Sequence, residues 1–458
     1  MITQILRYIR KYMHGPRSAD GRRKPLKGTR ALAPPRVALS LALSVSTFPA
    51  WPASADTPNP AIFPSASCDE PLQLTLNALQ WRADIRSMID SIERYHKNPF
   101  HYTPKLKLEK AAATLVDQVS ALSAEAIPVR MAQIVALIGD GHTRLVEPPH
   151  PTYPIRVYWF GNDLRITSTT ADSSELLGGK LERIGRYDVQ EVRARLRSLL
   201  PQDENRWLEM NRSPALLTDA TILFVLGIAK DPNHLDVQIT REDATELMKS
   251  LTALPQGTDD THWIQPFSTP PLYLAHQDEA VWFTTLPGTT TTYVLFNKYA
   301  GFEQNAQKIL QYIADTHPDR LIIDMRENGG GNFDLPRQYL LPFIKNNTVI
   351  NRRGSLYMII GRKTFSAAMT NSADFRQETN AILVGEPAGE RPNSYQENGT
   401  FCLPNSHLHL SVSTMYYKTV SGDPEALFPD KRIDLEWSDY QAGRDPVLAW
   451  ITRQPRAH

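Results

Sequence analysis

The spacing of apolar residues divides the chain into three successive regions. From residue 76 to about residue 138, apolar side chains recur every three or four positions, which predicts a group of helices. Between residues 153 and 245, short alternating segments such as "IRVYWF" and "LDVQIT" predict strands around one amphipathic helix. Beyond residue 281, apolar strands and amphipathic helices follow one another in turn. This last pattern predicts an α/β core with parallel strand pairing.

The first 55 residues differ from the rest in charge and texture. Ten Lys or Arg residues and one acid occur in residues 1–36, and the apolar run "VALSLALSVSTFPAWP" follows. That run is too short and too often broken by Ser and Pro for a membrane span. Ala53 and Ala55 supply small residues at a cleavage point. We therefore expect a signal peptide, a mature protein without a stable membrane span, and export to the periplasm or the medium.

The domain boundaries follow from these changes in pattern. We expect a signal peptide at 1–55, a linker at 56–75, a helical domain at 76–150, a strand-rich module at 153–245, a connection at 250–280 and the α/β core at 281–458.

Charge and cysteine content narrow the classes of function. The whole chain carries a net charge of +1, but residues 56–458 hold 40 basic and 48 acidic residues, a net charge of about −8. An acidic mature protein lacks the basic surface that nucleic-acid binding requires. Cys68 and Cys402 are the two cysteines of the chain, and whether they pair stays open at this point. His407 and His409 form an H-x-H pair without further ligands, so no metal or other cofactor is implied.

Two junctions of the α/β region carry residues suited to chemistry. Sites in such folds gather where strands end and helices begin. In "ENGGGN" (327–332) three glycines allow backbone N–H groups to converge, either as an oxyanion hole or as a tight turn. In "KTFSAA" (363–368), Ser366 stands at the start of a predicted helix, where serine is favoured as an N-cap. A nucleophilic serine needs a base, which arginine cannot provide, and Lys363 fits a surface position better.

Several motifs together resemble the tail-specific (carboxyl-terminal processing) serine peptidase superfamily. They are, in order, "LIIDMRENGGGN", "GRKTFSAAMTNSA", "AILVGEPAGERPNSY" and "FPDKRIDLEWSDYQAGRDPVLAW". The resemblance implies a crotonase-like (ClpP-like) spiral α/β core, an inserted PDZ-like module at 153–245 and peptide or protein substrates. It also implies that Ser366 is the nucleophile, with N–H groups of Gly330 or Gly331 and Ala367 as oxyanion donors.

One departure from the family pattern decides which branch the chain resembles. The lysine of the common Ser-Lys dyad lies 25 residues after the serine, and Arg391 stands there, which excludes that dyad. The tricorn-like branch instead takes a histidine from a D-G-H-[ST] segment, which matches His142 in "DGHT". Its acid is expected at Glu425, 59 residues after the serine, with Asp423 and Glu397 as the reserve candidates. Arg391 either binds a substrate carboxylate or forms a surface salt bridge.

The sequence therefore predicts an exported serine endopeptidase in which His142 activates Ser366. Two alternatives stay open: a catalytically inactive relative that binds peptides or other ligands, and a hydrolase that acts on a non-peptide ester. Self-association into a homo-oligomer and a binding role for the PDZ-like module also stay open.

Overall fold

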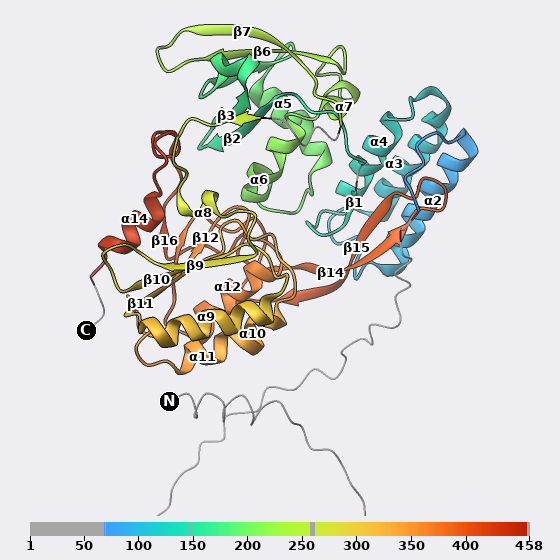
Figure 1. Cartoon of the computed structure of the whole chain (residues 1–458). Coiled ribbons are helices and arrows are strands. Elements are labelled where there is room, and N and C mark those ends of the chain that lie inside the picture. Colours follow the sequence, from blue (N-terminus) through green and yellow to red (C-terminus); the bar gives the residue numbers. More distant parts are fainter. Residues whose placement is uncertain (1–67, 69, 147, 257–261, 456–458) are drawn as a thin grey trace, which may run out of the picture. The chain divides into compact units, whose positions relative to one another are not determined.

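The chain has a mixed α/β fold with several sheets (Figure 1). In the computed structural model, residues 68, 70–146, 148–256 and 262–455 are described, and all of them belong to one compact unit. The expected signal peptide lies outside the described residues. Of the helices that the structure describes, none is long and apolar enough to cross a membrane.

The α/β region contains a six-stranded sheet in the order β16-β13-β12-β11-β10-β9. All neighbours pair in parallel except β9 and β10, so the predicted parallel pairing is confirmed. The strands are β9 (Val281–Thr285), β10 (Thr291–Phe296), β11 (Arg320–Asp324), β12 (Leu356–Ile360), β13 (Ile382–Gly385) and β16 (Lys431–Arg432).

Helices cover both faces of this sheet, which explains why its central strands are apolar throughout. Alternate residues of β10 point to opposite sides: Val294 joins a core with α9, α11 and α12, whereas Leu295 joins a core with α8 and α14. The helices of this region are α8 (Leu272–Ala275), α9 (Phe302–Thr316), α10 (Asp334–Tyr339), α11 (Leu341–Asn346), α12 (Ala367–Glu378), α13 (Trp437–Tyr440) and α14 (Pro446–Arg453).

The predicted N-terminal helices form and pack against a separate antiparallel sheet. Helices α2 (Ala78–Tyr95), α3 (Lys105–Gln118) and α4 (Ala126–Ala136) share a core with β14 (Asn393–Cys402) and β15 (His409–Lys418). The third strand, β1 (Arg144–Val146), follows α4 and pairs with β15. A disulfide joins Cys68 to Cys402, which answers the question that the sequence left open. Helices from the beginning of the described chain and strands from its end thus share one core.

The strand-rich region forms a third sheet in the order β2-β3-β4-β6-β7, with β5 and β8 at its side. Its elements are β2 (Ile155–Phe160), β3 (Asp163–Thr170), β4 (Lys180–Ile184), β5 (Tyr187–Asp188), α5 (Val189–Leu196), α6 (Arg206–Leu216), α7 (Ala220–Val225), β6 (His234–Thr240), β7 (Glu246–Thr252) and β8 (Trp263–Ile264). Strands β7 and β8 join this sheet although they lie beyond residue 245. Few residues of β7 are buried, so its sequence shows little apolar alternation.

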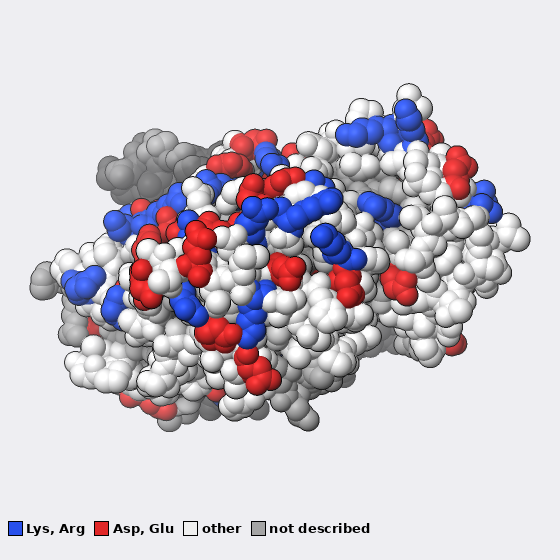
Figure 2. Space-filling view, turned by 90° about the horizontal axis from the view of Figure 1, so that it is seen from above, with Lys and Arg blue, Asp and Glu red and all other residues white. Residues whose placement is uncertain are grey.

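Charges of both signs are mixed on the face of the molecule in Figure 2. Basic and acidic side chains lie next to one another there rather than in separate stripes. This arrangement on the visible face agrees with the absence of an electrostatic signal for nucleic acid in the sequence.

Candidate active site

Ser366 lies in the turn between β12 and α12 and has an unusual backbone conformation. Its φ is +56° and its ψ is −128°, a combination that residues other than glycine rarely adopt. The residue occupies the N-cap position of α12, but its side chain makes no capping hydrogen bond. The hydroxyl therefore does not serve the helix, and the side chain is partly exposed. Strained backbone of this kind is concentrated at functional sites.

The glycine-rich turn after β11 lies directly against Ser366. Gly330 has a φ of +108°, and a Cβ atom at this position would lie 2.6 Å from the Cβ of Ser366. The Gly330 N–H donates to Oδ1 of Asn328 at 2.9 Å, so it is already used. Gly331 packs against the ring of Tyr299. Ala367 is the first residue of α12, where no acceptor within the helix is available to its N–H. Of the three predicted oxyanion donors, Gly331 and Ala367 are thus better suited than Gly330.

His142 lies in the loop between α4 and β1, and its side chain is buried. Its ring stacks on the ring of Phe365, with centroids 4.5 Å apart, and Phe365 directly precedes Ser366. Oδ1 of Asp140 accepts the N–H groups of His142 and Thr143, at 3.0 and 2.7 Å. The Asp-Gly-His-Thr segment is therefore a turn built on Asp140, and it brings His142 to the nucleophile segment.

Asp140 is itself held by His96, which comes from the end of α2. Nε2 of His96 lies 2.9 Å from Oδ2 of Asp140, and both side chains are buried. The N–H of Asn98 donates to Nδ1 of His96, so the proton of the neutral ring is on Nε2. Burial raises the pKa of Asp140, but the bonds from His96, Ser413 and Thr143 outweigh it and lower the pKa to about 2. Asp140 is therefore ionised. The sequence gave no sign of this support for His142.

Glu390 connects the Ser366 segment with His142. This residue lies between β13 and β14 and is fully buried. Its Oε2 accepts the N–H of Ser366, and its Oε1 lies 3.5 Å from Nδ1 of His142. Ser394 also donates to Oε1, at 3.0 Å. Burial and the neighbouring charge of Glu204 hold the pKa of Glu390 well above its usual range. One carboxylate thus contacts both predicted catalytic segments.

The electrostatic environment keeps the His142 ring neutral. Burial is the largest influence, and with the charges of Arg212 and Arg144 it outweighs the attraction of Asp140 and lowers the pKa of His142 to about 4. Neither ring nitrogen has a hydrogen-bond partner among the described residues. A neutral imidazole with an unused nitrogen is the form in which histidine can accept a proton.

The three carboxylates expected to orient His142 have other surroundings. Glu425 is exposed, and its main-chain carbonyl accepts a hydrogen bond from Asn205. Asp423 pairs with Arg391 at 3.1 Å, and Glu397 accepts the hydroxyl of Tyr417 at 3.0 Å. The carboxylate that the structure places beside His142 is that of Glu390. Its one signal in the sequence is that it directly precedes the residue at the family's lysine position.

The position of Arg391 favours the surface salt bridge over a substrate contact. Its guanidinium pairs with Asp423, whose side chain is 68% exposed. Its main-chain N–H donates to Oε2 of Glu204 at 3.1 Å. Lys363 is also exposed and donates to Glu327 at 3.1 Å, as expected of a surface residue.

Glu204, in the loop before α6, joins the two catalytic segments from a third side. Its Oε1 accepts the N–H of Gly141, which precedes His142, at 3.0 Å. Its Oε2 accepts the N–H of Arg391, which follows Glu390. Burial of the carboxyl raises the pKa of Glu204 to about 7, although these two N–H groups oppose the rise. Neither Glu204 nor Glu390 was among the residues predicted from the sequence, because both act through folded proximity.

The described residues contain one group of side chains close enough together to hold a metal ion. Cys68, Cys402 and His409 place their ligand atoms within 4.8 Å of one another. Both sulfur atoms belong to the disulfide, and a metal ligand must be a thiolate. This group therefore does not fit a metal centre while the disulfide is formed.

Comparisons with known proteins show the fold. A scan against protein-family models finds no match, and a search of curated proteins finds none either. Among solved structures, mature CPAF superimposes with a TM-score of 0.57 at 11% identity, over 82% of this chain and 96% of that one. Mature CPAF complexed with lactacystin gives a TM-score of 0.56 at 11% identity, over 82% and 97%. The photosystem II D1 C-terminal processing protease is more distant, with a TM-score of 0.39 at 12% identity, over 77% and 93%. The fold of this chain is thus that of CPAF over almost the whole length of the latter.

Proposed function

We propose that this chain is an exported serine endopeptidase that uses Ser366, His142 and Glu390. The observation that carries the proposal is the Glu390 carboxylate, which accepts the N–H of Ser366 and faces the imidazole of His142. A triad is recognised by geometry rather than by order along the chain. Glu390 takes the role that the sequence had assigned to Glu425.

Each residue has one task in the proposed reaction. With Nδ1 of His142 turned to Glu390, Nε2 is the nitrogen that removes the hydroxyl proton of Ser366. The oxygen of Ser366 then attacks the peptide carbonyl carbon, and the carbonyl electron pair moves to its oxygen. Glu390 stabilises the imidazolium that forms, which requires its carboxyl group to be ionised at that moment.

The glycine-rich turn and the start of α12 stabilise the tetrahedral intermediate. We assign the N–H groups of Gly331 and Ala367 as donors to the oxyanion, since that of Gly330 is bonded to Asn328. Collapse of the intermediate breaks the C–N bond, and His142 returns its proton to the leaving amine. Water then hydrolyses the acyl-enzyme by the same proton transfers.

The rest of the chain supports this function in two ways. The fold shared with CPAF and the family motifs favour a crotonase-like core, and we interpret the sheet of β2 to β7 as the inserted PDZ-like module. The Cys68–Cys402 disulfide favours an exported protein, because disulfides persist in oxidising compartments.

Labelling with a fluorophosphonate probe tests the proposal. The purified protein should be labelled, and labelling should disappear in Ser366→Ala and fall strongly in His142→Ala. Ser372→Ala is the matched control, because this serine lies on the same helix with its hydroxyl bonded to the carbonyl of Ala368. Absence of labelling in the folded wild-type protein would favour the inactive, ligand-binding relative. Labelling with turnover of esters but of no peptide would favour the ester hydrolase.

A further inference from the structure

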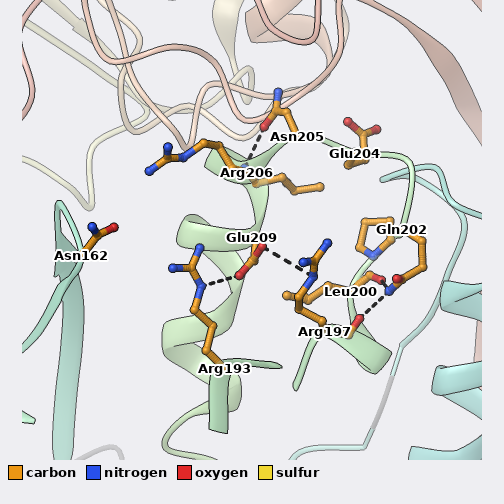
Figure 3. Close-up of a pocket in the computed structure, with 11 residues that line it drawn as sticks. Asn162, Arg193, Arg197, Leu200, Gln202, Glu204, Asn205, Arg206 and Glu209 are labelled. Carbon is orange, nitrogen blue, oxygen red and sulfur yellow. Dashed lines mark hydrogen bonds and ion pairs between the residues drawn. The ribbon is translucent and has the colours of Figure 1, made fainter. Parts of the chain in front are cut away.

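A polar cavity of about 400 Å³ lies beside the loop that carries Glu204 (Figure 3). Three arginine side chains line it: Arg193 at the end of α5, Arg197 just after α5, and Arg206 at the start of α6. Arg197 and Arg206 are exposed, so their guanidinium groups are open to solvent. The volume lies within the range of sites that bind small molecules or side chains.

The arginines of this pocket outnumber the carboxylates that neutralise them. Glu209 lies between Arg193 and Arg197, and both contacts run through the Nε atoms, with the second at 3.9 Å (Figure 3). The carboxylate of Glu204 accepts main-chain N–H groups of Gly141 and Arg391. The pocket therefore has an excess of positive charge. The Nη atoms of a guanidinium are suited to paired hydrogen bonds with an oxyanion.

We propose that this arginine pocket binds acidic side chains of polypeptide substrates. The inference rests on the proposed function, since a peptidase meets its ligands as polypeptides. A carboxylate between Arg197 and Arg206 would receive charged hydrogen bonds at a site that already contains the counter-charge it needs.

Glu204 links the pocket to the catalytic residues. The residue lines the pocket, and its two oxygens hold the segments that carry His142 and Glu390. Asn205, next in the chain, donates to the carbonyls of Ala388 and Glu425. A side chain bound in the pocket would thus lie one residue away from the support of the active site. Binding energy gained there selects substrates at a distance from the scissile bond.

Peptide binding to the Ser366→Ala protein tests this assignment without turnover. Fluorescence anisotropy would compare a labelled peptide rich in glutamate with the same peptide carrying glutamine. We expect about tenfold tighter binding of the glutamate peptide, which corresponds to one charged hydrogen bond, and a smaller difference at high salt. Arg197→Gln combined with Arg206→Gln should remove the difference. Both residues are exposed, so folding should persist, as thermal denaturation would verify.

Arg195→Gln is the matched control. This arginine lies on α5 between the other positions, but it pairs with Glu191 and stacks on Tyr187. Equal affinities of the two peptides, or the same loss in the control, would overturn the proposal. Displacement of the glutamate peptide by inorganic phosphate at equal concentration would assign the pocket to free anions and also overturn it. Probe labelling of Ser366 is measured separately, so a failure here is distinguishable from a failure of the peptidase assignment.

Discussion

Nδ1 of His142 lies 3.5 Å from Oε1 of Glu390, with both side chains buried. The two residues are 248 positions apart in the chain, and they meet because the loop after α4 and the loop after β13 both approach the start of α12. The other oxygen of the same carboxylate accepts the N–H of Ser366. Glu390 is therefore suited both to orient the base and to fix the backbone of the nucleophile.

Replacement of Glu390 by Gln should lower kcat far more than replacement of Glu425 by Gln. The amide cannot stabilise an imidazolium, so we expect a loss of roughly 10³-fold or more. Glu425 is exposed, and its contact to Asn205 uses its main chain, so E425Q should change kcat less than about twofold. Steady-state kinetics on a fluorogenic peptide would measure both. The reverse order of effects would restore the assignment made from the sequence.

The pH dependence of kcat/KM should report the buried carboxyl groups rather than His142. The pKa of His142 is lowered to about 4, so the base is still neutral at pH 5. The pKa of Glu390 is raised by burial and by the charge of Glu204, so Glu390 takes up a proton first as the pH falls. Since the protonated acid cannot stabilise the imidazolium, activity should decline on acidification at a pH well above 4.

The variant Glu204→Gln tests the origin of this decline. Removing the charge of Glu204 should lower the pKa of Glu390, which would then stay ionised to lower pH, although Asp140, Arg212 and Arg144 still act on the site. The acid limb of kcat/KM should therefore move to lower pH, even if the lost hydrogen bond reduces the maximal rate. An acid limb that stays in place or moves upward would contradict this account.

The predictable parts of this protein are those with local signals. Periodicity identified the helices before residue 138 and the parallel strands after residue 290, because burial on one or both faces imposes a pattern on the residues themselves. Ser366, His142 and the glycine turn lie in short motifs that belong to single loops. The structure adds to the sequence interpretation that Ser366 does not cap its helix by its side chain.

The remaining site residues could not be predicted because their roles depend on distant contacts. Glu390 and Glu204 are single acids in loops, and only the folded chain brings them to Gly141, His142 and Ser366. His96 is likewise defined by its bond to Asp140, 44 positions away. The spacing rule that pointed to Glu425 failed to indicate Glu390, since it carries a position from a family pattern and not a contact.

Reduction of the Cys68–Cys402 disulfide should lower thermal stability. The bond joins residues 334 positions apart, so its loss would free a very long loop in the unfolded chain. Disulfides contribute about 2–5 kcal/mol in such cases. We expect a lower Tm for the double variant Cys68→Ala/Cys402→Ala by differential scanning fluorimetry. Added reductant should lower the Tm of the wild type but not that of the variant. Equal Tm values for wild type and variant without reductant would show that the bond does not stabilise the fold.

Gly330→Ala should abolish activity, whereas Gly329→Ala should not. A Cβ at Gly330 would lie 2.6 Å from Cβ of Ser366 and 3.0 Å from the carbonyl oxygen of Phe365, and the φ of +108° disfavours any side chain. The nucleophile or the turn must move, and a shift of about 1 Å at a reacting group costs roughly 100-fold in rate. Gly329 has no atom within 4 Å of its Cβ position and does not need a positive φ, so it is the matched control within the same turn. Rates of probe labelling, compared at equal folded concentration, would measure the effect. Equal labelling of the two variants would mean that Gly330 does not determine the position of Ser366.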